Sequence, residues 1–256
     1  MMKYLHKFFN SNLIVEIRNR INFRPVNYLY KVNENFIASD LFIWRLDNGY
    51  STIFKASNIL EKFYDCESYL KFVFFDKEGK FIKAVNCEFR FGFSELLIDF
   101  SILKREDYGT FYVLNLPKKP ATINFKVTNR CYVGYGKEEK FSMVHGNLVG
   151  VMSTPSPKLK TPQNIRSAVS AKKGNFHYYI QKKLCHSANH FLIFSNPMKR
   201  IMSLKIQGQD FFIEPMGCKI IKIQNTKKPI RIDSDFFQPR PILESSNKDY
   251  YDFHHC

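Results

Sequence analysis

The sequence predicts a mainly β protein, built as two β-sandwich-like halves with an N-terminal amphipathic helix. Three observations support this fold class. The chain contains 26 Phe and 14 Tyr, and aromatic side chains favour strands. Short apolar runs alternate with turn signals from residue 26 onward. The length of 256 residues leaves room for two domains of about 100–150 residues.

Residues 3–24 predict the helix. Its apolar residues recur at steps of three and four and share one face, and basic residues flank them. The apolar positions are Leu5, Phe8, Phe9, Ile14, Ile17 and Ile21. We interpret residues 1–25 as a helical arm that packs on its own domain or on a partner. The alternative is peripheral contact with a membrane surface, which basic amphipathic helices also make.

The first sandwich is expected over residues 26–150. Its clearest element is Lys71–Val85, where two strands flank a turn at Asp76–Gly79. Tyr108–Leu116 indicates another strand. Ser57–Tyr64 starts with a residue that can cap a helix, but in this β context we expect a strand or loop.

Residues 151–174 are predicted to form a linker or long loop, because three prolines lie there among Ser, Thr and Lys. A second, smaller sandwich half follows over residues 175–256. Its segments Lys219–Gln224 and Ile230–Ser234 alternate apolar with polar residues, which indicates strands with one buried face. Regularly spaced strands favour a sandwich. The small size of this half leaves open a single core shared by both halves.

The charge is strongly basic and uneven. The net charge is +16, and residues 151–230 hold 14 Lys and Arg against two acids. Such a field attracts a polyanion, namely an anionic glycan, an anionic membrane or nucleic acid; the alternative is a solvated lysine-rich surface. No apolar run is long enough to span a bilayer, and the N-terminus lacks a secretory signal. We therefore expect a cytoplasmic protein, or one peripheral to the inner face of the membrane, whose six scattered cysteines are reduced.

The common catalytic and nucleotide-binding motifs GxGxxG, GxxxxGK[ST], GxSxG and HExxH are absent, as is a CxxC pair, and we expect no cofactor. Ser39–Arg45 places Trp44 beside Arg45, where an arginine can stack on an indole or hold a carboxylate. With Tyr50, Trp44 would offer a flat face to a glycan. The alternative is a buried Trp44 with Asp40 and Arg45 paired.

Histidines suggest the only candidate chemistry. His145 follows a glycine-rich segment, and His254 and His255 lie next to the C-terminus. His145 with one of them would form a metal site or an acid–base pair. Neighbouring strand residues point to opposite faces, so at most one of His254 and His255 would converge with His145. The alternative is that all three are hydrogen-bonded structural residues.

Several short motifs occur in an order that resembles a set of uncharacterised bacterial two-β-sandwich proteins encoded among surface-polysaccharide biosynthesis genes. The motifs are SDLFIWR, VFFDKEG, DYGTF, GYG followed by VHGN, PRPIL and DFHHC. Tyr135, Asn147 and Arg240 lie in them and join Trp44, Arg45 and Tyr50 as candidate ligand-binding residues. The resemblance implies glycan assembly on the cytosolic side, and no catalytic residue.

Function is therefore expected to be a non-catalytic accessory or binding role in surface-glycan biosynthesis. Its partner would be an anionic glycan, a lipid-linked intermediate or a glycan-assembly enzyme. Two alternatives stay open. One is a glycan- or sugar-nucleotide-modifying enzyme that uses His145 with a C-terminal histidine. The other is a nucleic-acid-binding protein that uses the basic second half, where charge and exposed aromatic residues would have to combine.

Overall fold

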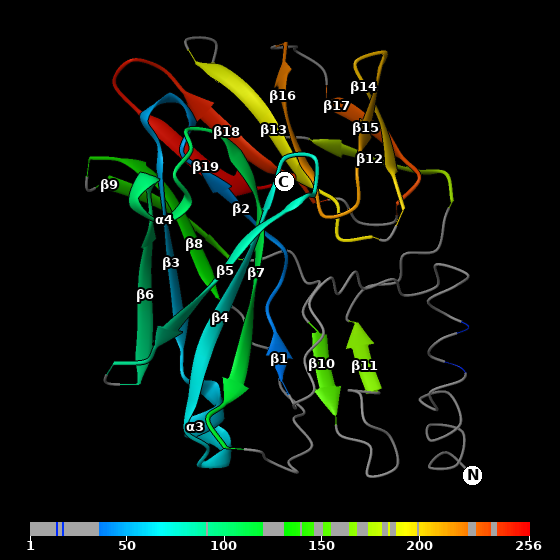
Figure 1. Ribbon diagram of the computed structural model, residues 1–256. Helices are drawn as coiled ribbons and strands as arrows, with labels where there is room; N and C mark the ends of the chain where they lie inside the picture. Colours follow the sequence, from blue (N-terminus) through cyan, green and yellow to red (C-terminus); the bar gives the residue numbers. More distant parts are fainter. Residues whose placement is uncertain are drawn as a thin grey trace.

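The structure is a computed structural model, and it is mainly β, as the sequence predicts (Figure 1). It describes positions 14 and 17, residues 36–90, 92–119, 131–138, 140–145, 151–154, 164–167, 174–180, 184, 188–198, 200–224, 229–236 and 240–256. The predicted N-terminal helix lies almost entirely outside these residues and stays a prediction. No helix in the described part of the chain has the length and apolar character needed to cross a membrane.

Four antiparallel sheets form the described fold, in an arrangement that resembles a four-bladed propeller. The largest, called the large sheet, has the order β11-β10-β1-β7-β4-β5, with β2 also paired to β7. Its strands are β1 (Ile37–Ala38), β2 (Phe42–Arg45), β4 (Ser68–Asp76), β5 (Phe81–Glu88), β7 (Tyr108–Pro117), β10 (Val151–Thr154) and β11 (Asn164–Ser167). The β4–β5 hairpin and strand β7 confirm two sequence predictions.

The other three sheets have four strands each. The β3 sheet has the order β6-β3-β8-β9, with β3 (Ser51–Ser57), β6 (Phe93–Ile98), β8 (Tyr132–Lys137) and β9 (Lys140–His145). The β14 sheet has the order β12-β17-β14-β15, with β12 (Phe176–Ile180), β14 (Met202–Ile206), β15 (Gln209–Ile213) and β17 (Ile230–Ser234). The β13 sheet has the order β16-β13-β18-β19, with β13 (Asn189–Ser195), β16 (Cys218–Ile223), β18 (Ile242–Ser246) and β19 (Tyr251–His255).

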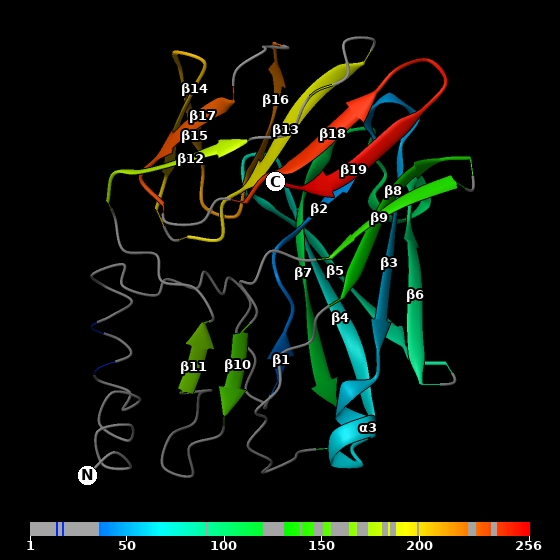
Figure 2. The same cartoon turned by 180° about the vertical axis from the view of Figure 1, so that it is seen from behind.

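The β13 sheet is buried on both faces. Leu192 and Phe194 belong to a hydrophobic cluster shared with the β14 sheet, whereas Ile193 between them belongs to a cluster shared with the large and β3 sheets. Figures 1 and 2 show the β13 sheet with the β14 sheet on one side and the β3 sheet on the other. One hydrophobic core therefore takes side chains from both sides of residues 151–174.

Two short strands lie in the segment predicted as a linker or long loop. Strand β10 pairs with β1 and with β11, so both extend the large sheet. The prolines at positions 155, 157 and 162 fall between the two strands. Proline has no backbone N–H to donate to a sheet, so the prolines exclude strand pairing only at their own positions and not over the whole of residues 151–174. The domain boundaries drawn from this segment stay a prediction.

The strand or loop expected at Ser57–Tyr64 is wrong. Residues Ile59–Tyr64 form helix α3, and Asn58 is its N-cap. The Asn58 side chain accepts the Glu61 backbone N–H at 3.3 Å and donates to the Glu61 carboxylate at 2.8 Å. A capped first turn satisfies backbone donors that a helix otherwise leaves unpaired. This cap stabilises the helix even though the neighbouring segments are strands. A second short helix, α4 (Phe100–Leu103), follows β6.

The β4–β5 turn docks on the turn at residues 214–217, which joins β15 to β16. The Cys218 N–H donates to the carbonyl oxygen of Lys77 at 3.0 Å. Gly79 has a φ of 79°, and a Cβ atom there would overlap the carbonyl oxygen of Pro215. This backbone contact therefore requires glycine, and it joins the two predicted halves.

Asn115 on β7 is a polar residue within the core. It is 1% exposed, and neither atom of its amide has a hydrogen bond among the described residues. Burying an unpaired amide costs about 1–3 kcal/mol. We expect Asn115→Leu, which is similar in size, to raise the free energy of unfolding by about 1–2 kcal/mol in urea titrations. Asn115→Asp should do the reverse, and a leucine variant no more stable than wild type would contradict the prediction.

Candidate functional site

Four of the candidate ligand-binding residues, including the platform residues Trp44 and Tyr50, lie inside the molecule. Trp44, Arg45, Tyr50 and Tyr135 are all buried. The Trp44 indole N–H donates to a β4 carbonyl at 2.9 Å, and the Tyr135 hydroxyl donates to a β2 carbonyl at 3.0 Å. Burying large rings removes much apolar surface from water, and their polar tips are satisfied internally. The structure therefore corrects the platform interpretation, and the alternative of a buried Trp44 describes it.

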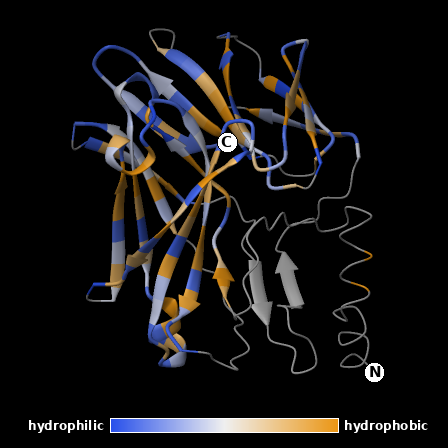
Figure 3. Ribbon diagram, viewed as in Figure 1, coloured by the Kyte–Doolittle hydropathy of each residue, from blue (hydrophilic) through white to orange (hydrophobic). Residues whose placement is uncertain are grey.

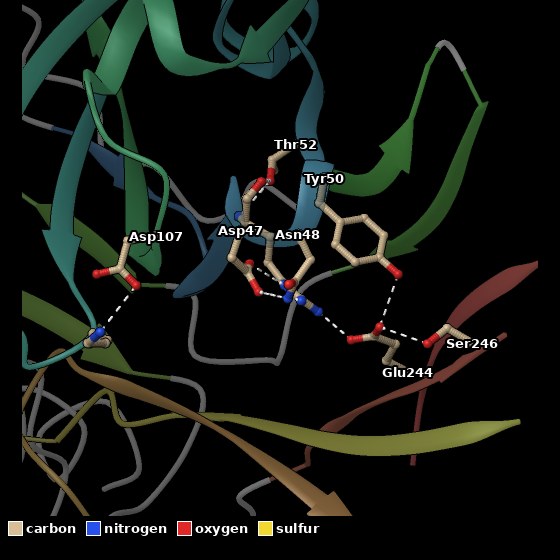
Figure 4. A network of polar contacts seen from close by, with 9 residues as sticks. Asp47, Asn48, Tyr50, Thr52, Asp107, Glu244 and Ser246 are labelled. Carbon is tan, nitrogen blue, oxygen red and sulfur yellow. Dashed lines mark hydrogen bonds and ion pairs between the residues drawn. The ribbon is translucent and has the colours of Figure 1, made fainter. Parts of the chain in front are cut away.

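Arg45 joins distant parts of the chain through the carboxylates of Asp47 and Glu244, both labelled in Figure 4. Its guanidinium donates to Asp47 at 2.8 and 2.7 Å, and to Glu244 on β18, which is 199 residues away. Glu244 also accepts hydrogen bonds from the Tyr50 hydroxyl at 3.0 Å and from Ser246 at 3.2 Å. Both Arg45 and Glu244 are almost fully buried. We call these five residues the Arg45 network.

The charges of the Arg45 network act on the Tyr50 ring and on the pKa values of its members. Arg45 lies 4.5 Å and Lys137 lies 4.6 Å from the centre of the Tyr50 ring. Burial and the charge of Glu244 raise the pKa of Tyr50, so its hydroxyl stays a donor. Burial alone would lower the pKa of Arg45, but Asp47 and Glu244 outweigh it, and the pKa is raised. Arg45 is paired with Asp47 and Glu244 rather than with Asp40, the partner suggested by the sequence.

The structure brings His145 and His255 together. Their ring centroids are 4.9 Å apart, and the His255 ring Nε2 bonds to the backbone carbonyl of His145. His254 points to the other face of β19, where its Nδ1 lies 3.0 Å from Asp252. Arg240 is half-buried, and its positive charge lowers the pKa of His255. Asn147 lies outside the described residues.

Among the described residues, the histidine pair has no metal-ligand set around it. Across the described ranges, no group of three or more His, Cys, Asp or Glu side chains is placed to hold a metal ion. A zinc site needs three or four protein ligands. The hydrogen bond from the His255 ring to the His145 backbone instead ties the end of β19 to the end of β9.

The pH dependence of stability should report on His255. Burial lowers the pKa of His255, the hydrogen bond to the His145 carbonyl opposes this in part, and charge repulsion from His145, Arg240 and His254 lowers the pKa further. Below about pH 6.5 the unfolded chain takes up a proton that folded His255 resists, so stability falls as the pH falls. We expect wild type to lose more stability than His255→Asn between pH 7 and pH 5. Parallel losses in thermal melts of both proteins would refute this.

The open face of the β3 sheet was not predicted from the sequence. On β6 the outward residues Phe93 and Leu97 are 52% and 46% exposed. Tyr132 on β8 is 54% exposed, and Met143 on β9 is 39% exposed. Figure 3 shows hydrophobic and hydrophilic residues interleaved along β6. We call this surface the apolar face.

Strand pairing aligns the apolar face in rows. Leu97 is opposite Ile53 on β3, Ile53 is opposite Gly134 on β8, and Gly134 is opposite Met143 on β9. A Cβ atom at Gly134 would overlap the Met143 sulfur and lie 2.8 Å from the Ile53 side chain. Because Gly134 has no side chain, Ile53 and Met143 can extend over it and form a continuous apolar row with Leu97 across four strands.

A surface ion pair lies within the apolar face. Lys55 on β3 is directly opposite both Glu95 on β6 and Tyr132 on β8. The Lys55 ammonium is 2.7 Å from the Glu95 carboxylate, and these side chains are 46% and 44% exposed. Phe93 and Leu97 flank Glu95 on the same side of β6. The face thus offers donors and acceptors within an apolar surround.

A signal for the apolar face exists in the sequence. Phe93–Ile98 carries apolar residues at both odd and even positions, so a strand there cannot bury them all against one core. Such a strand needs a cover on each face or leaves one face apolar toward solvent. Without the strand pairing, nothing in the sequence joins Tyr132 and Met143 to it.

Comparison with known proteins identifies no family. No family model and no curated protein matches the chain. Of the solved structures, an α-L-rhamnosidase from Streptomyces avermitilis matches 93% of this chain with 28% of its own, at 7% identity and a TM-score of 0.24. A β-D-glucuronidase for Dictyoglomus thermophilum matches 87% with 36% of its own, at 8% identity and a TM-score of 0.19. The CupB6 tip adhesin from Pseudomonas aeruginosa matches 91% with 88% of its own, at 8% identity and a TM-score of 0.19.

These likenesses define neither a fold nor an activity. All three TM-scores are far below the value at which two structures share a fold. The chain also spans only 28% and 36% of the two enzymes it matches.

Proposed function

We propose that this chain is a non-catalytic glycan-binding protein, and that the apolar face of the β3 sheet is its binding surface. The observation that carries the proposal is the exposed Lys55–Glu95 ion pair beside exposed Phe93, Leu97 and Tyr132. A sugar ring has an apolar C–H side and a rim of hydroxyl groups. The face offers apolar side chains for the first, and a hydrogen-bond donor and acceptor for the second.

The shape of the surface favours a chain of sugars over a compact ligand. The outward residues form rows across four strands rather than a closed cavity. Exposed apolar patches on a single chain usually mark an interaction surface. Lys55 and Glu95 neutralise each other, so the face itself does not require a charged partner, and the basic residues elsewhere would supply any preference for an anionic glycan.

The wider setting is part of the same proposal. An accessory role in bacterial surface-glycan biosynthesis, in the cytoplasm or at the inner face of the membrane, agrees with the basic charge. The division into two sandwich-like halves is also part of the proposal. One hydrophobic cluster, between the β14 and β13 sheets, supports a separate second half, whereas the other cluster takes side chains from the large, β3 and β13 sheets and joins the halves.

Aromatic truncation tests the binding face. Tyr132→Ala and Phe93→Ala should each weaken binding by about tenfold or more, because a buried aromatic contact contributes more than about 1 kcal/mol at a binding centre. Binding is measured on an array of bacterial surface polysaccharides, with heparin and dextran as anionic and neutral references. Both residues are about half exposed, so the melting temperature should not change.

Exposed aromatic residues elsewhere provide matched controls. Tyr179 on β12 is 50% exposed and Phe212 on β15 is 61% exposed. Tyr179→Ala and Phe212→Ala should bind the array as wild type does. Equal binding by all four variants, or no glycan bound by wild type, would count against the proposal.

A second candidate is an enzyme acting on a glycan or sugar nucleotide. The neighbouring rings of His145 and His255, with centroids 4.9 Å apart, favour it, since histidine is the side chain most often used for general acid–base catalysis. Incubation with UDP-glucose, followed by chromatography, tests for turnover. Turnover lost in His145→Gln at an unchanged melting temperature would support the enzyme, and no turnover by wild type would remove it.

Nucleic-acid binding by the basic half can be read in the same assays. A single-stranded oligonucleotide replaces the glycan at low and high salt. Binding that falls steeply with salt indicates phosphate contacts. Binding of the oligonucleotide with no glycan bound would favour this alternative.

A further inference from the structure

The apolar face contains two parallel rows of side chains that differ in polarity. The first, called the polar row, crosses from Glu95 on β6 through Lys55 on β3 to Tyr132 on β8. Residues directly opposite each other in an antiparallel pair point to the same face, and all three of these are exposed. The second, called the apolar row, crosses the same strands from Leu97 on β6 to Met143 on β9. One part of the face can therefore form hydrogen bonds, and the part beside it is apolar.

The apolar row lies on one side of the polar row. The two rows are two residues apart along each strand, a separation of about 7 Å. Leu97 and Met143 are 46% and 39% exposed, and Ile53 between them is 7% exposed. On the other side of the polar row, Phe93 is opposite Ser57, so a hydroxyl group interrupts the apolar surface there. A sugar ring held on the polar row therefore has one edge over a continuous apolar strip.

The polar row keeps hydrogen-bonding capacity although its ion pair is formed. The Lys55 ammonium has three N–H donors and the Glu95 carboxylate has about four acceptor sites, so a single contact at 2.7 Å leaves most of them available. These side chains are 46% and 44% exposed, so the remaining donors and acceptors are open to solvent. Neighbouring sugar hydroxyl groups can bond to both while the ring lies on Tyr132, which is 54% exposed.

The apolar row determines which substituent suits the ring edge above it. A hydroxymethyl group over Leu97 and Met143 would place its hydroxyl where the apolar row offers no strong hydrogen-bond partner. A methyl group in the same place would cover apolar surface instead. We propose that the apolar face selects sugars that carry a methyl group beside neighbouring hydroxyl groups, as a 6-deoxyhexose or an N-acetylhexosamine does. This inference rests on the proposed function and names the class of sugar that the same site takes.

The test uses three sugars that share the galacto configuration and differ in one substituent. D-galactose has a C6 hydroxyl, D-fucose has a C6 methyl, and N-acetyl-D-galactosamine has an acetamido methyl. Each is titrated into the full chain and followed by NMR of the backbone amides of Leu97, Tyr132 and Met143. We expect saturable shifts, with at least one methyl-bearing sugar bound about fivefold tighter than D-galactose, which corresponds to about 1 kcal/mol. The tighter of the two identifies the source of the methyl group.

One variant and a matched control locate the preference. Leu97→Ser removes the apolar contact and should bring the three dissociation constants to within about twofold of each other. Ile201 lies outside the β3 sheet and is 47% exposed, against 46% for Leu97, so Ile201→Ser should keep the preference of wild type. Tyr132→Ala should weaken all three sugars, which would tie the shifts to the apolar face.

Failure of this inference can be told from failure of the proposed function. Equal affinity of wild type for the three sugars, with shifts that Tyr132→Ala abolishes, would overturn the methyl preference and leave glycan binding standing. A preference that Leu97→Ser retains would overturn the assignment to the apolar row. Absence of saturable shifts with all three sugars would also overturn the inference, and the polysaccharide array then decides the proposed function separately.

Discussion

Arg45→Met should destabilise the protein by about 3–5 kcal/mol, because it leaves Glu244 buried without its cation. Glu244 is 3% exposed, so water cannot replace the lost partner. Tyr50 and Ser246 still donate hydrogen bonds to it, but neither carries a positive charge. Urea denaturation, monitored by the fluorescence of the single tryptophan, measures the loss.

Two further variants show that the loss comes from the unpaired charge. The double variant Arg45→Met/Glu244→Leu should recover most of the stability, since replacing both members of a buried pair by apolar residues is often neutral or favourable. Lys118→Met removes an exposed ion pair with Glu88 and should leave the melting temperature unchanged. The explanation fails if the double variant is no more stable than Arg45→Met.

Gly79→Ala should cost about 3–4 kcal/mol. A left-handed backbone costs a side-chain-bearing residue about 1–2 kcal/mol. The added Cβ would also overlap the Pro215 carbonyl, which is backbone and cannot rotate away. The hairpin must then leave the 214–217 turn, with loss of the Cys218 to Lys77 hydrogen bond. Thermal and urea unfolding of the variant would measure this.

Gly208→Ala separates the two contributions. Gly208 has a φ of 84°, close to that of Gly79, but a Cβ atom added to it would have no described neighbour within 4 Å. It should therefore cost only the backbone term, about 1–2 kcal/mol. Equal losses in the two variants would show that the docking contact contributes nothing.

Much of the β architecture could be predicted from local patterns. The hairpin around Asp76–Gly79 has a turn signal between two apolar runs, and Ile230–Ser234 alternates cleanly. Helix α3 is hard to predict because a one-residue shift of the cap, from Ser57 to Asn58, decides whether the first turn is satisfied. Strands β10 and β11 were not predicted, because the prolines between them make the whole of residues 151–174 resemble a loop.

The candidate sites were harder to predict, since they depend on pairing between distant segments. Trp44 and Tyr135 were candidate ligand-binding residues and both are buried, because ring size alone does not say whether a ring faces a core or a ligand. Arg45 takes its buried partner from the opposite end of the chain, a contact that no spacing rule indicates. The apolar face needs the register of four strands before Phe93, Tyr132 and Met143 become neighbours.

The double-sided burial of the β13 sheet has a consequence for biosynthesis. The hydrophobic cluster shared by the large, β3 and β13 sheets cannot form completely until β18 and β19 have been synthesised, because Ile242 and Phe253 belong to it. Tyr50 precedes its partner Glu244 by 194 residues, which at about 5–20 residues per second is about 10–40 s of translation. The aromatic residues of β3, β4 and β7 are synthesised early in that interval and then lack the β13-sheet residues that cover them. We therefore expect the nascent chain to be a strong client of ribosome-associated holding chaperones, and to fold only after synthesis of β19.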